Sequence, residues 1–268
     1  MSSRRIAVLL LLCLPFAAPA SAREICTLVA DTDTGAVLIE DGDCARRVTP
    51  ASTFKIALAL MGYESGFLKD AHAPRLAYRK GDADWGGAAW KQPTDPRHWL
   101  EHSVVWYSQR ITHALGSAAF ERYVRRFDYG NADVSGDPGK ANGLDRAWIA
   151  SSLAISPREQ VAFLRKLVTG SLDVGKPAIA ATLDVVERRH LVDGSSVQGK
   201  TGMAYPRDAR GRFDRAHPWG WYVGWGRIAG RSVVFARLIQ EEARQPGSAG
   251  ARARDALLEA LPAQLAGR

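Results

Sequence analysis

An apolar helix begins at the stretch Pro50-Ala51-Ser52-Thr53-Phe54-Lys55. Proline suits the first turn of a helix, because its missing N–H would have no partner there. Residues 56–61 are strong helix formers or apolar, as a buried helix requires. Ser52 and Lys55 are three positions apart, so the sequence predicts that they lie on the same face of this helix.

The pair of Ser52 and Lys55 has the composition of a nucleophile and its base. A serine hydroxyl becomes nucleophilic when a base lies within hydrogen-bond distance. The free N–H groups of the first turn and the positive end of the helix dipole would face any negative charge that develops at the serine. Ser-x-x-Lys also occurs by chance in many proteins. Other parts of the sequence are therefore needed to show whether this pair is catalytic.

The first 22 residues are typical of a secretory signal peptide. They contain two arginines, an apolar run over residues 6–14, and a small-residue cleavage site at Ala20-Ser21-Ala22. This apolar run is too short to span a bilayer. We therefore expect a periplasmic protein that is cleaved after Ala22, begins near Arg23 and keeps no membrane anchor.

Charge and cysteine content narrow the classes of function. Cleavage removes two of the 36 basic residues and none of the 28 acidic ones, which leaves a net charge of +6. The basic residues are scattered, whereas a nucleic-acid-binding protein would carry a basic patch with interleaved aromatic residues. Cys26 and Cys44 flank a predicted hairpin and either form a disulfide in an oxidising compartment or remain separate thiols.

The predicted elements divide the chain into two lobes. Strand patterns occur near both ends, over residues 25–30, 36–40, 195–202, 219–225 and 232–238. Helical patterns occur over residues 96–99, 105–115, 118–127, 157–169, 178–190 and 252–265. We expect one catalytic domain, in which an α/β lobe (residues 23–57 and 190–268) packs against a helical lobe (residues 58–189). A cleft between two lobes is a common place for a small-molecule site.

Three more short motifs carry reactive or polar groups. Lys200-Thr201-Gly202 lies in a strand pattern and offers a cation and a hydroxyl suited to a carboxylate, or it is an ordinary strand. Ser103-Val104-Val105 begins a predicted helix, where the serine either relays a proton or caps the helix. Tyr129-Gly130-Asn131 is equally typical of a simple turn.

In this order, the motifs Ser-Thr-Phe-Lys, Ser-x-Val, Tyr-Gly-Asn and Lys-Thr-Gly resemble those of the class D (oxacillinase-type) serine β-lactamases. Further matching segments are Trp148, Ile155-Ser156-Pro157-Arg158-Glu159-Gln160 and Gly220-Trp221-Tyr222-Val223-Gly224-Trp225. The resemblance implies an α+β fold of the β-lactamase/transpeptidase type. That fold has an antiparallel sheet flanked by terminal helices, together with an all-helical lobe.

The resemblance also implies roles in the hydrolysis of β-lactam antibiotics. Ser52 would attack the β-lactam carbonyl and become acylated, and Ser103 would pass a proton to the leaving nitrogen. The backbone N–H groups of Ser52 and Met203 would form an oxyanion hole.

The resemblance places the substrate carboxylate against Lys200, Thr201, Gly202 and an arginine near the C-terminal helix. Arg254 has the apolar residues that should follow at three and seven positions, whereas Arg252 better fits the preceding glycine. We favour Arg254 for this role.

Lys55 would be carboxylated by CO2 in this family, and the carbamate would serve as general base for acylation and deacylation, without a metal or another cofactor. Phe54, Val105, Trp148 and Ile149 would surround the lysine with apolar groups and lower its pKa, so that the neutral amine can react. The indole N–H of Trp148 is a lone donor suited to the carbamate anion.

Two further motifs suggest other chemistry. Residues 194–201 match the spacing of a phosphate-binding loop, but Gly202 and Pro206 oppose the helix that should follow. His98-Trp99-Leu100-Glu101-His102 matches the spacing of a class of zinc peptidases, although no helix with a distant carboxylate ligand is evident. We therefore expect neither nucleotide binding nor zinc catalysis.

Two alternatives share the same serine and lysine. A penicillin-binding DD-peptidase and a β-lactam sensor domain are both acylated without rapid turnover. Peptidases usually carry further domains or an anchor, and sensors follow membrane helices, while Trp148 and the apolar residues around Lys55 favour the hydrolase. The sequence leaves the range of penicillins, cephalosporins and carbapenems open, and also the oligomeric state.

Overall fold

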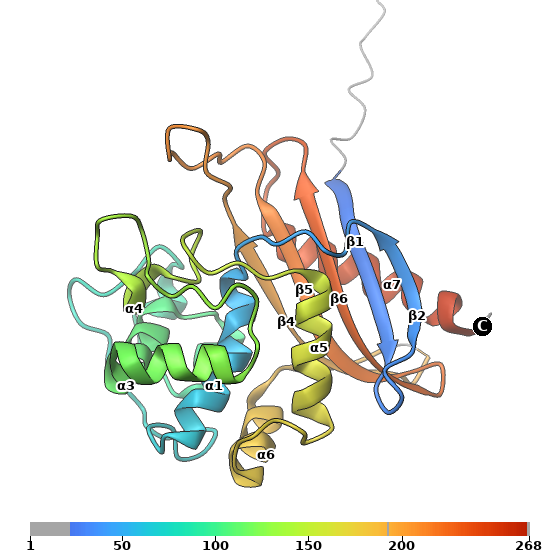
Figure 1. Ribbon diagram of the computed structural model, residues 1–268, viewed down its shortest axis with the longest axis horizontal. Coiled ribbons are helices and arrows are strands. Elements are labelled where there is room, and N and C mark those ends of the chain that lie inside the picture. The colour runs from blue at the N-terminus through green and yellow to red at the C-terminus, as the bar shows by residue number, and fades with distance from the viewer. Residues whose placement is uncertain (1–21, 192, 267–268) are drawn as a thin grey trace, which may run out of the picture.

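The computed structural model describes residues 22–191 and 193–266, so the predicted signal peptide, apart from Ala22, lies outside the described residues. Within them an antiparallel sheet has the strand order β2-β1-β6-β5-β4-β3 (Figure 1). The strands are β1 (Ala22–Asp31), β2 (Val37–Gly42), β3 (Arg188–His190), β4 (Ser196–Ala204), β5 (Trp219–Ile228) and β6 (Arg231–Glu241). N- and C-terminal parts of the chain therefore form one sheet.

Helices cover both faces of this sheet and form a second lobe beside it (Figure 1). The α-helices are α1 (Lys55–Glu64), α2 (Pro96–Glu101), α3 (Val105–Arg126), α4 (Gly143–Arg146), α5 (Pro157–Val168), α6 (Lys176–Val185) and α7 (Ala249–Ala266). Short 3₁₀ helices are η1 (Ala51–Phe54) and η2 (Ala88–Trp90). Helix α7 packs on β4, β5 and β6, α5 packs on β1, β5 and β6, and α1 packs against α3 and α6.

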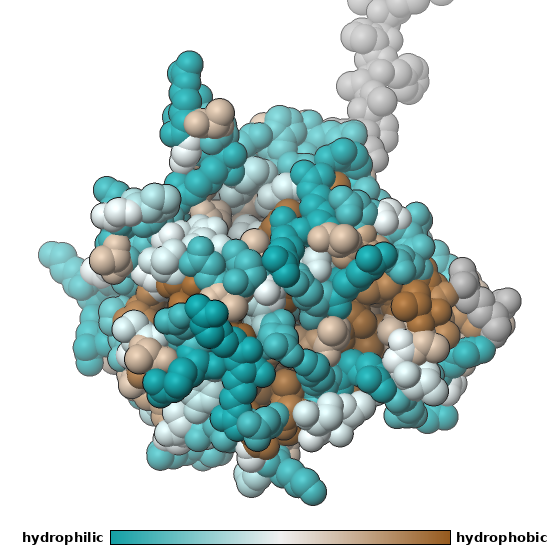
Figure 2. Space-filling model, viewed as in Figure 1, coloured by the Kyte–Doolittle hydropathy of each residue, from teal (hydrophilic) through white to brown (hydrophobic). Residues whose placement is uncertain are grey.

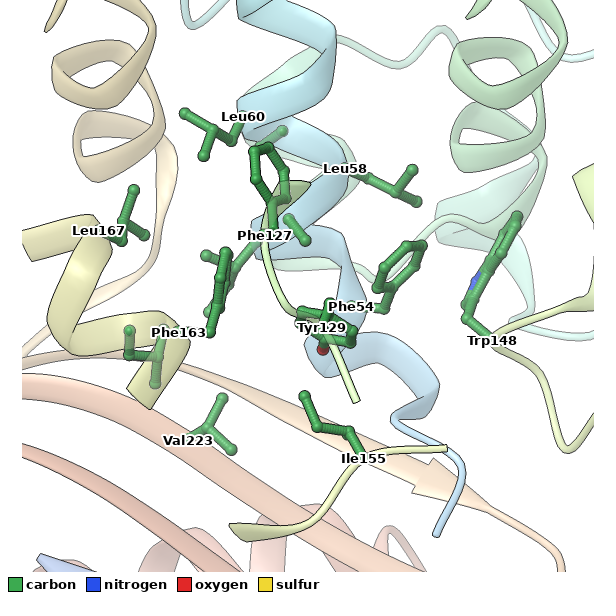
Figure 3. Packing of buried hydrophobic residues seen from close by; sticks show 14 of the residues in the cluster. Phe54, Leu58, Leu60, Phe127, Tyr129, Trp148, Ile155, Phe163, Leu167 and Val223 are labelled. Carbon is green, nitrogen blue, oxygen red and sulfur yellow. The ribbon is translucent and has the colours of Figure 1, made fainter. Parts of the chain in front are cut away.

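Helix α1 is the centre of the molecule, and its residues from Lys55 to Tyr63 are all buried. Figure 3 shows Leu58 and Leu60 on this helix among apolar side chains from other elements. Among these are Phe163 and Leu167 from α5 and Val223 from β5. Close packing on every side of the helix fixes the position of η1, which directly precedes it.

Helix α5 begins where local sequence signals say it should. The Ser156 hydroxyl accepts a hydrogen bond from the Glu159 backbone, and the Glu159 side chain accepts one from the Ser156 backbone. Pro157 occupies the first turn, where no N–H partner is needed. This capping box starts a helix whose apolar face lies against the sheet.

One predicted helix ends earlier in the structure. The helix expected over residues 178–190 ends at Val185, and residues 188–190 are strand β3, paired with β4 through Arg188 and Gln198. Edge pairing explains this difference. The break expected between the helices over 105–115 and 118–127 lies within α3 at Gly116, where φ is +73°.

Cys26 on β1 and Cys44 after β2 form a disulfide, with Cα atoms 5.0 Å apart. In the described part of the chain, no helix has the length and apolar character needed to cross a bilayer. The face seen in Figure 2 is mostly hydrophilic, and apolar side chains show mainly between α5 and the β1–β2 edge.

Candidate active site

Ser52 and Lys55 lie together at the start of α1, as the sequence predicts. Ser52 is in the 3₁₀ turn η1 and Lys55 is the first residue of α1, so the chain tightens between them. Lys55 Nζ is 3.1 Å from Ser52 Oγ, within hydrogen-bond distance. A serine hydroxyl and an amine in this arrangement are suited to proton transfer.

Lys55 has no solvent-exposed surface. Burial lowers the pKa of Lys55 well below its usual value, and the nearby charge of Lys200 lowers this pKa further. Desolvation disfavours the charged ammonium because the low-dielectric interior cannot replace its hydration. The amine is therefore driven toward the neutral form, which can act as a base or as a nucleophile.

Lys200 on β4 reaches across to the helical lobe. Its Nζ lies 2.6 Å from Ser103 Oγ and 3.3 Å from the Thr201 carbonyl oxygen. Burial lowers the pKa of Lys200 to about 8, with opposing effects from Glu187, which raises it, and Arg254, which lowers it. The second serine predicted from the sequence is thus in contact with a lysine that can gain or lose a proton near neutral pH.

Strand β4 turns one backbone edge toward Ser52. Its pairing with β3 extends only to Gln198, and the Gly199 N–H still points to that side, toward the Glu187 carbonyl. Backbone groups alternate along a strand, so the N–H of Met203, four residues on, points to the same edge. Beyond β3 that edge is occupied by η1.

Gly202 permits the close approach of β4 and η1. A methyl group at this position would lie 3.0 Å from the Pro50 carbonyl oxygen and 3.1 Å from Thr53 Cγ2. The glycine therefore sets the distance between the lysine-bearing strand and the serine-bearing turn.

Trp148 lies behind the serine and lysine with its ring fully buried. It stacks on Phe54 with ring centroids 5.7 Å apart and meets the edge of Phe120 (Figure 3). Its Nε1 atom is buried and has no hydrogen-bond partner among the described residues. A buried donor without a partner is costly, so this N–H is placed for an acceptor that occupies the site.

Most of these groups surround a cavity of about 300 Å³ between the lobes, whereas Lys200 and Phe54 are not among its lining residues. Its lining residues are Ala51, Ser52, Lys55, Trp85, Gly86, Trp90, Ser103, Val105, Trp148, Ile149, Thr201, Gly202, Met203 and Ser248. The cavity brings together most of the site residues predicted from the sequence. Larger cavities elsewhere on the surface do not contain them.

Known proteins show the same combination of fold and motifs. Residues 25–261 match the family model described as the penicillin binding protein transpeptidase domain. β-Lactamase OXA-9 of Klebsiella pneumoniae is 43% identical over 243 residues, which make up 88% of this chain and 86% of that protein. The crystal structure of the class D β-lactamase OXA-427 matches with a TM-score of 0.83 at 46% identity, over 91% of this chain and 98% of that chain.

The chain belongs to the class D serine β-lactamases. The predicted family and the predicted fold are both confirmed. A more distant relative is the regulatory protein BlaR1 of Bacillus licheniformis, which is 30% identical over 76% of this chain and 31% of that protein.

In this β-lactamase the predicted arginine is not at the cavity. Arg254 lies on α7 and its Nε donates to Asp255 Oδ1 at 2.8 Å, while Arg252 is paired with Glu241 and the Pro246 carbonyl. Ser248, directly before α7, lines the cavity instead. Arg254 is still close enough for its charge to lower the pKa of Lys200.

The residues of Tyr129-Gly130-Asn131 do not line the cavity of the β-lactamase but contact the segments that do. The Tyr129 hydroxyl lies 3.4 Å from Gln160 Oε1, and Gln160 Nε2 donates to Thr53 Oγ1 in η1. The Asn131 side chain bonds to the backbone of Ser152 and Ala154. These contacts make the motif a brace for the serine turn and for the segment after Trp148.

Five residues that line the cavity do not belong to the predicted site: Ala51, Trp85, Gly86, Trp90 and Ser248. Trp90 is buried, whereas 63% of the Trp85 surface is exposed. Their rings pack with centroids 5.4 Å apart at the rim of the cavity. Ser248 has no motif of its own, and only the packing of α7 reveals it.

The two other motifs have structural explanations in the β-lactamase. Residues 196–201 of the phosphate-loop pattern are in strand β4, which continues to Ala204 where a helix would be required. The rings of His98 and His102 stack with centroids 4.3 Å apart, and His98 Nε2 contacts the Ala89 carbonyl. Among the described residues, no group of three or more His, Cys, Asp or Glu side chains is arranged to hold a metal ion.

Proposed function

We propose that this β-lactamase hydrolyses its substrates through an acyl-enzyme on Ser52, with a carboxylated Lys55 as general base in both half-reactions. The single observation that carries the proposal is the buried Lys55 amine 3.1 Å from Ser52 Oγ, in a cavity that also contains the unpartnered Trp148 N–H. The remaining residues of the cavity provide the other groups that the reaction needs.

Acylation begins with attack of Ser52 Oγ on the β-lactam carbonyl carbon, with loss of the hydroxyl proton to the base at Lys55. Negative charge on the carbonyl oxygen falls between the backbone N–H groups of Ser52 and Met203. When the amide C–N bond breaks, Ser103 donates its proton to the nitrogen, and Lys200, 2.6 Å away, replaces that proton. Before deacylation the base at Lys55 returns its proton to solvent and Lys200 regains one. Water then attacks the ester carbon and gives a proton to the base, and the Ser52 oxygen leaves with that proton.

The residues around Lys55 fit a carbamate. Addition of CO2 to an amine needs the neutral form and releases one proton, and burial favours that form here. In the same cavity, the Trp148 indole is a donor that finds no acceptor among residues 22–191 and 193–266. When present, the carbamate supplies a carboxylate base for the serine and water protons. Val105 and Ile149 line the cavity and limit access of bulk water.

Lys200 and Thr201 are the proposed contacts of the substrate carboxylate. Lys200 supplies a positive charge below its pKa of about 8, and Thr201 lines the cavity on the same strand. Ser248, directly before α7, adds a hydroxyl to the lining of the same cavity. Charge-assisted hydrogen bonds of this kind orient an anionic substrate.

A steady-state assay against a panel of β-lactams, with and without added bicarbonate, tests the proposal. We expect turnover of penicillins that falls when CO2 is removed and returns with bicarbonate. Rapid quenching followed by intact-mass measurement should trap one substrate equivalent on Ser52, and Ser52→Ala should trap none. Turnover that is indifferent to bicarbonate would contradict the role of the carbamate.

The same experiment distinguishes a β-lactam hydrolase from the two alternatives, a sensor domain and a DD-peptidase. A sensor domain or a DD-peptidase would be acylated to one equivalent and then hydrolyse the ester very slowly. A base that remains in place after acylation distinguishes hydrolysis from such trapping, and the environment of Lys55 and Trp148 supports it. We also propose export to the periplasm, which the Cys26–Cys44 disulfide supports because such bonds persist in oxidising compartments.

A further inference from the structure

Ala150, two residues after Trp148, is held in an unfavourable backbone conformation. Its φ is +51°, in the left-handed region that residues with a Cβ atom rarely adopt. Its N–H donates to Thr49 Oγ1 at 3.0 Å, and its carbonyl accepts from Arg207 Nε at 2.8 Å. Such a conformation persists only where surrounding contacts enforce it.

The contacts of Ala150 continue to the catalytic serine. Thr49 Oγ1 donates to the Trp148 carbonyl at 2.9 Å, and the same carbonyl accepts the N–H of Ala51 at 3.1 Å. Ala51 directly precedes Ser52 and also has a positive φ, +51°. The segments around Trp148 and Ser52 are therefore joined through one threonine and one carbonyl.

Arg207 approaches this junction from outside the site. It belongs to the loop of residues 205–218 between β4 and β5, which stands out at the upper left of Figure 1 in orange. In addition to the Ala150 carbonyl, its guanidinium donates to the Gly211 carbonyl at 2.9 Å and to Asp137 Oδ1 at 2.8 Å. The Phe213 ring covers it, with the centroid 4.5 Å away.

Asp137 is a fixed partner for this arginine. The Ser151 hydroxyl donates to the same carboxylate oxygen at 2.8 Å, and Asn142 Nδ2 lies 3.2 Å from the other. Burial acts to raise the pKa of Asp137, but these hydrogen bonds and the charge of Arg207 hold it below its usual value. Arg207 and Ser151, the residue after Ala150, therefore bind the same Asp137 carboxylate.

We propose that Arg207 is a positioning residue, which fixes Ala150 and through it keeps Trp148 in place against Lys55. This inference rests on the proposed function, because its consequence is the retention of CO2 at Lys55. Arg207 is absent from the cavity lining and so acts through the backbone. Its planar guanidinium donates to Ala150, Gly211 and Asp137 together in a fixed geometry that the compact ammonium of a lysine does not reproduce.

The test compares Arg207→Ala with Arg212→Ala. Arg212 is on the same loop, its side chain is 69% exposed, and it pairs with Asp208 within that loop. The first readout is titration of each protein with ¹³C-bicarbonate, followed by the NMR signal of the lysine carbamate. The second readout is hydrogen exchange of the Ala51 and Ala150 amides.

We expect Arg207→Ala to need about tenfold more bicarbonate for half-occupancy, the factor typical of losing a charge-assisted hydrogen bond. Its Ala51 and Ala150 amides should exchange faster, whereas Arg212→Ala should match the parent protein in both readouts. In assays, kcat of Arg207→Ala should recover at high bicarbonate while KM stays unchanged. Arg207→Lys should restore only part of the effect.

Other outcomes separate this inference from the proposed function. If the parent protein gives no carbamate signal, the proposal that a carboxylated Lys55 is the general base is wrong. Amide exchange alone then tests the positioning role of Arg207. Unchanged exchange and unchanged bicarbonate titration in Arg207→Ala would overturn the inference. If that variant does not fold, Asp137→Asn replaces it, because it removes the charge that holds Arg207 and keeps the side-chain shape.

Discussion

Lys200 Nζ lies 2.6 Å from Ser103 Oγ, and this contact joins the sheet to the helical lobe across the active site. The lysine is 5% exposed and has a pKa of about 8. In the proposed mechanism this one side chain supplies the proton for the leaving nitrogen and contacts the substrate carboxylate. Its charge state links activity and stability to pH.

The first prediction concerns the alkaline limb of activity. Above pH 8 Lys200 loses its proton and its attraction for the substrate carboxylate, so kcat/KM should fall about tenfold between pH 7 and 9. A penicillin methyl ester lacks the carboxylate, so its decline should be shallower and should reflect only the proton that Lys200 supplies through Ser103. Equal declines for the penicillin and its ester would contradict a contact between Lys200 and the substrate carboxylate.

A second prediction concerns Trp148. In Trp148→Phe an aromatic ring still packs on Phe54, but the donor N–H is lost. We expect the variant to fold and to require about ten to a hundred times more bicarbonate for half-maximal kcat, since a hydrogen bond to a charged group is removed. Full activity at ambient CO2 would exclude the indole as the partner of the carbamate.

The third prediction concerns stability against pH. Because burial lowers the pKa of Lys200 to about 8, between pH 8 and 10 the unfolded chain holds a proton that the folded chain has released. The free energy of unfolding should therefore rise over this window, by about 2 to 3 kcal/mol from Lys200 alone. Lys55 acts in the same direction.

Chemical denaturation at several pH values checks this prediction. In Lys200→Met the increase should be smaller than in the parent protein by the contribution of that lysine. Above about pH 10 the trend should reverse, because burial raises the pKa of Tyr63 and Tyr129 and keeps their hydroxyls protonated in the fold. A flat profile from pH 8 to 10 would contradict the assignment.

The substrate carboxylate gives a fourth prediction. Ser248 lines the cavity, whereas the Arg254 guanidinium is paired with Asp255. Ser248→Ala should lower kcat/KM for penicillins about tenfold, and Arg254→Ala less than threefold. The methyl ester should be insensitive to both. A reversed ranking would return the carboxylate contact to Arg254.

The pairing of Ser52 with Lys55 can be predicted from the sequence because these two residues are close neighbours along the chain. Helical periodicity alone places Ser52 beside Lys55, and motif order supplies the strand with Lys200 and Thr201. The capping box of α5 and the glycine break in α3 are also local signals. Where a property depends on a few neighbouring residues, the prediction agrees with the structure.

The position of Arg254 shows what local signals lack. The rotation of α7 is set by the side that packs on the sheet, with Gly250 against Gly202 and with Ala253 and Leu257 buried. A methyl group at Gly250 would lie 2.6 Å from the Gly202 carbonyl oxygen, so the helix can rest there only through a glycine. The spacing of residues within α7 gives no information about this contact between Gly250 and Gly202.

The contacts of Arg207 could not be predicted from the sequence for a related reason. Its partners Ala150 and Asp137 are 57 and 70 positions away, in a segment with no regular periodicity. Thr49 likewise joins Trp148 across 99 positions. Such contacts are made only when the two lobes and their loops come together, and no short motif encodes them.

The last prediction concerns Trp85 at the rim of the cavity. This side chain is 63% exposed and packs on Trp90, so its loss should change the free energy of unfolding by less than about 0.5 kcal/mol. Exposed aromatic surface beside a substrate cavity favours ligands that cover it. Trp85→Ala should therefore raise KM roughly two- to tenfold for penicillins with an aromatic acyl side chain. Penicillins with a small side chain are the matched control, and their KM should stay within twofold. An equal increase for both classes would mean that Trp85 shapes the cavity as a whole and does not contact the acyl group.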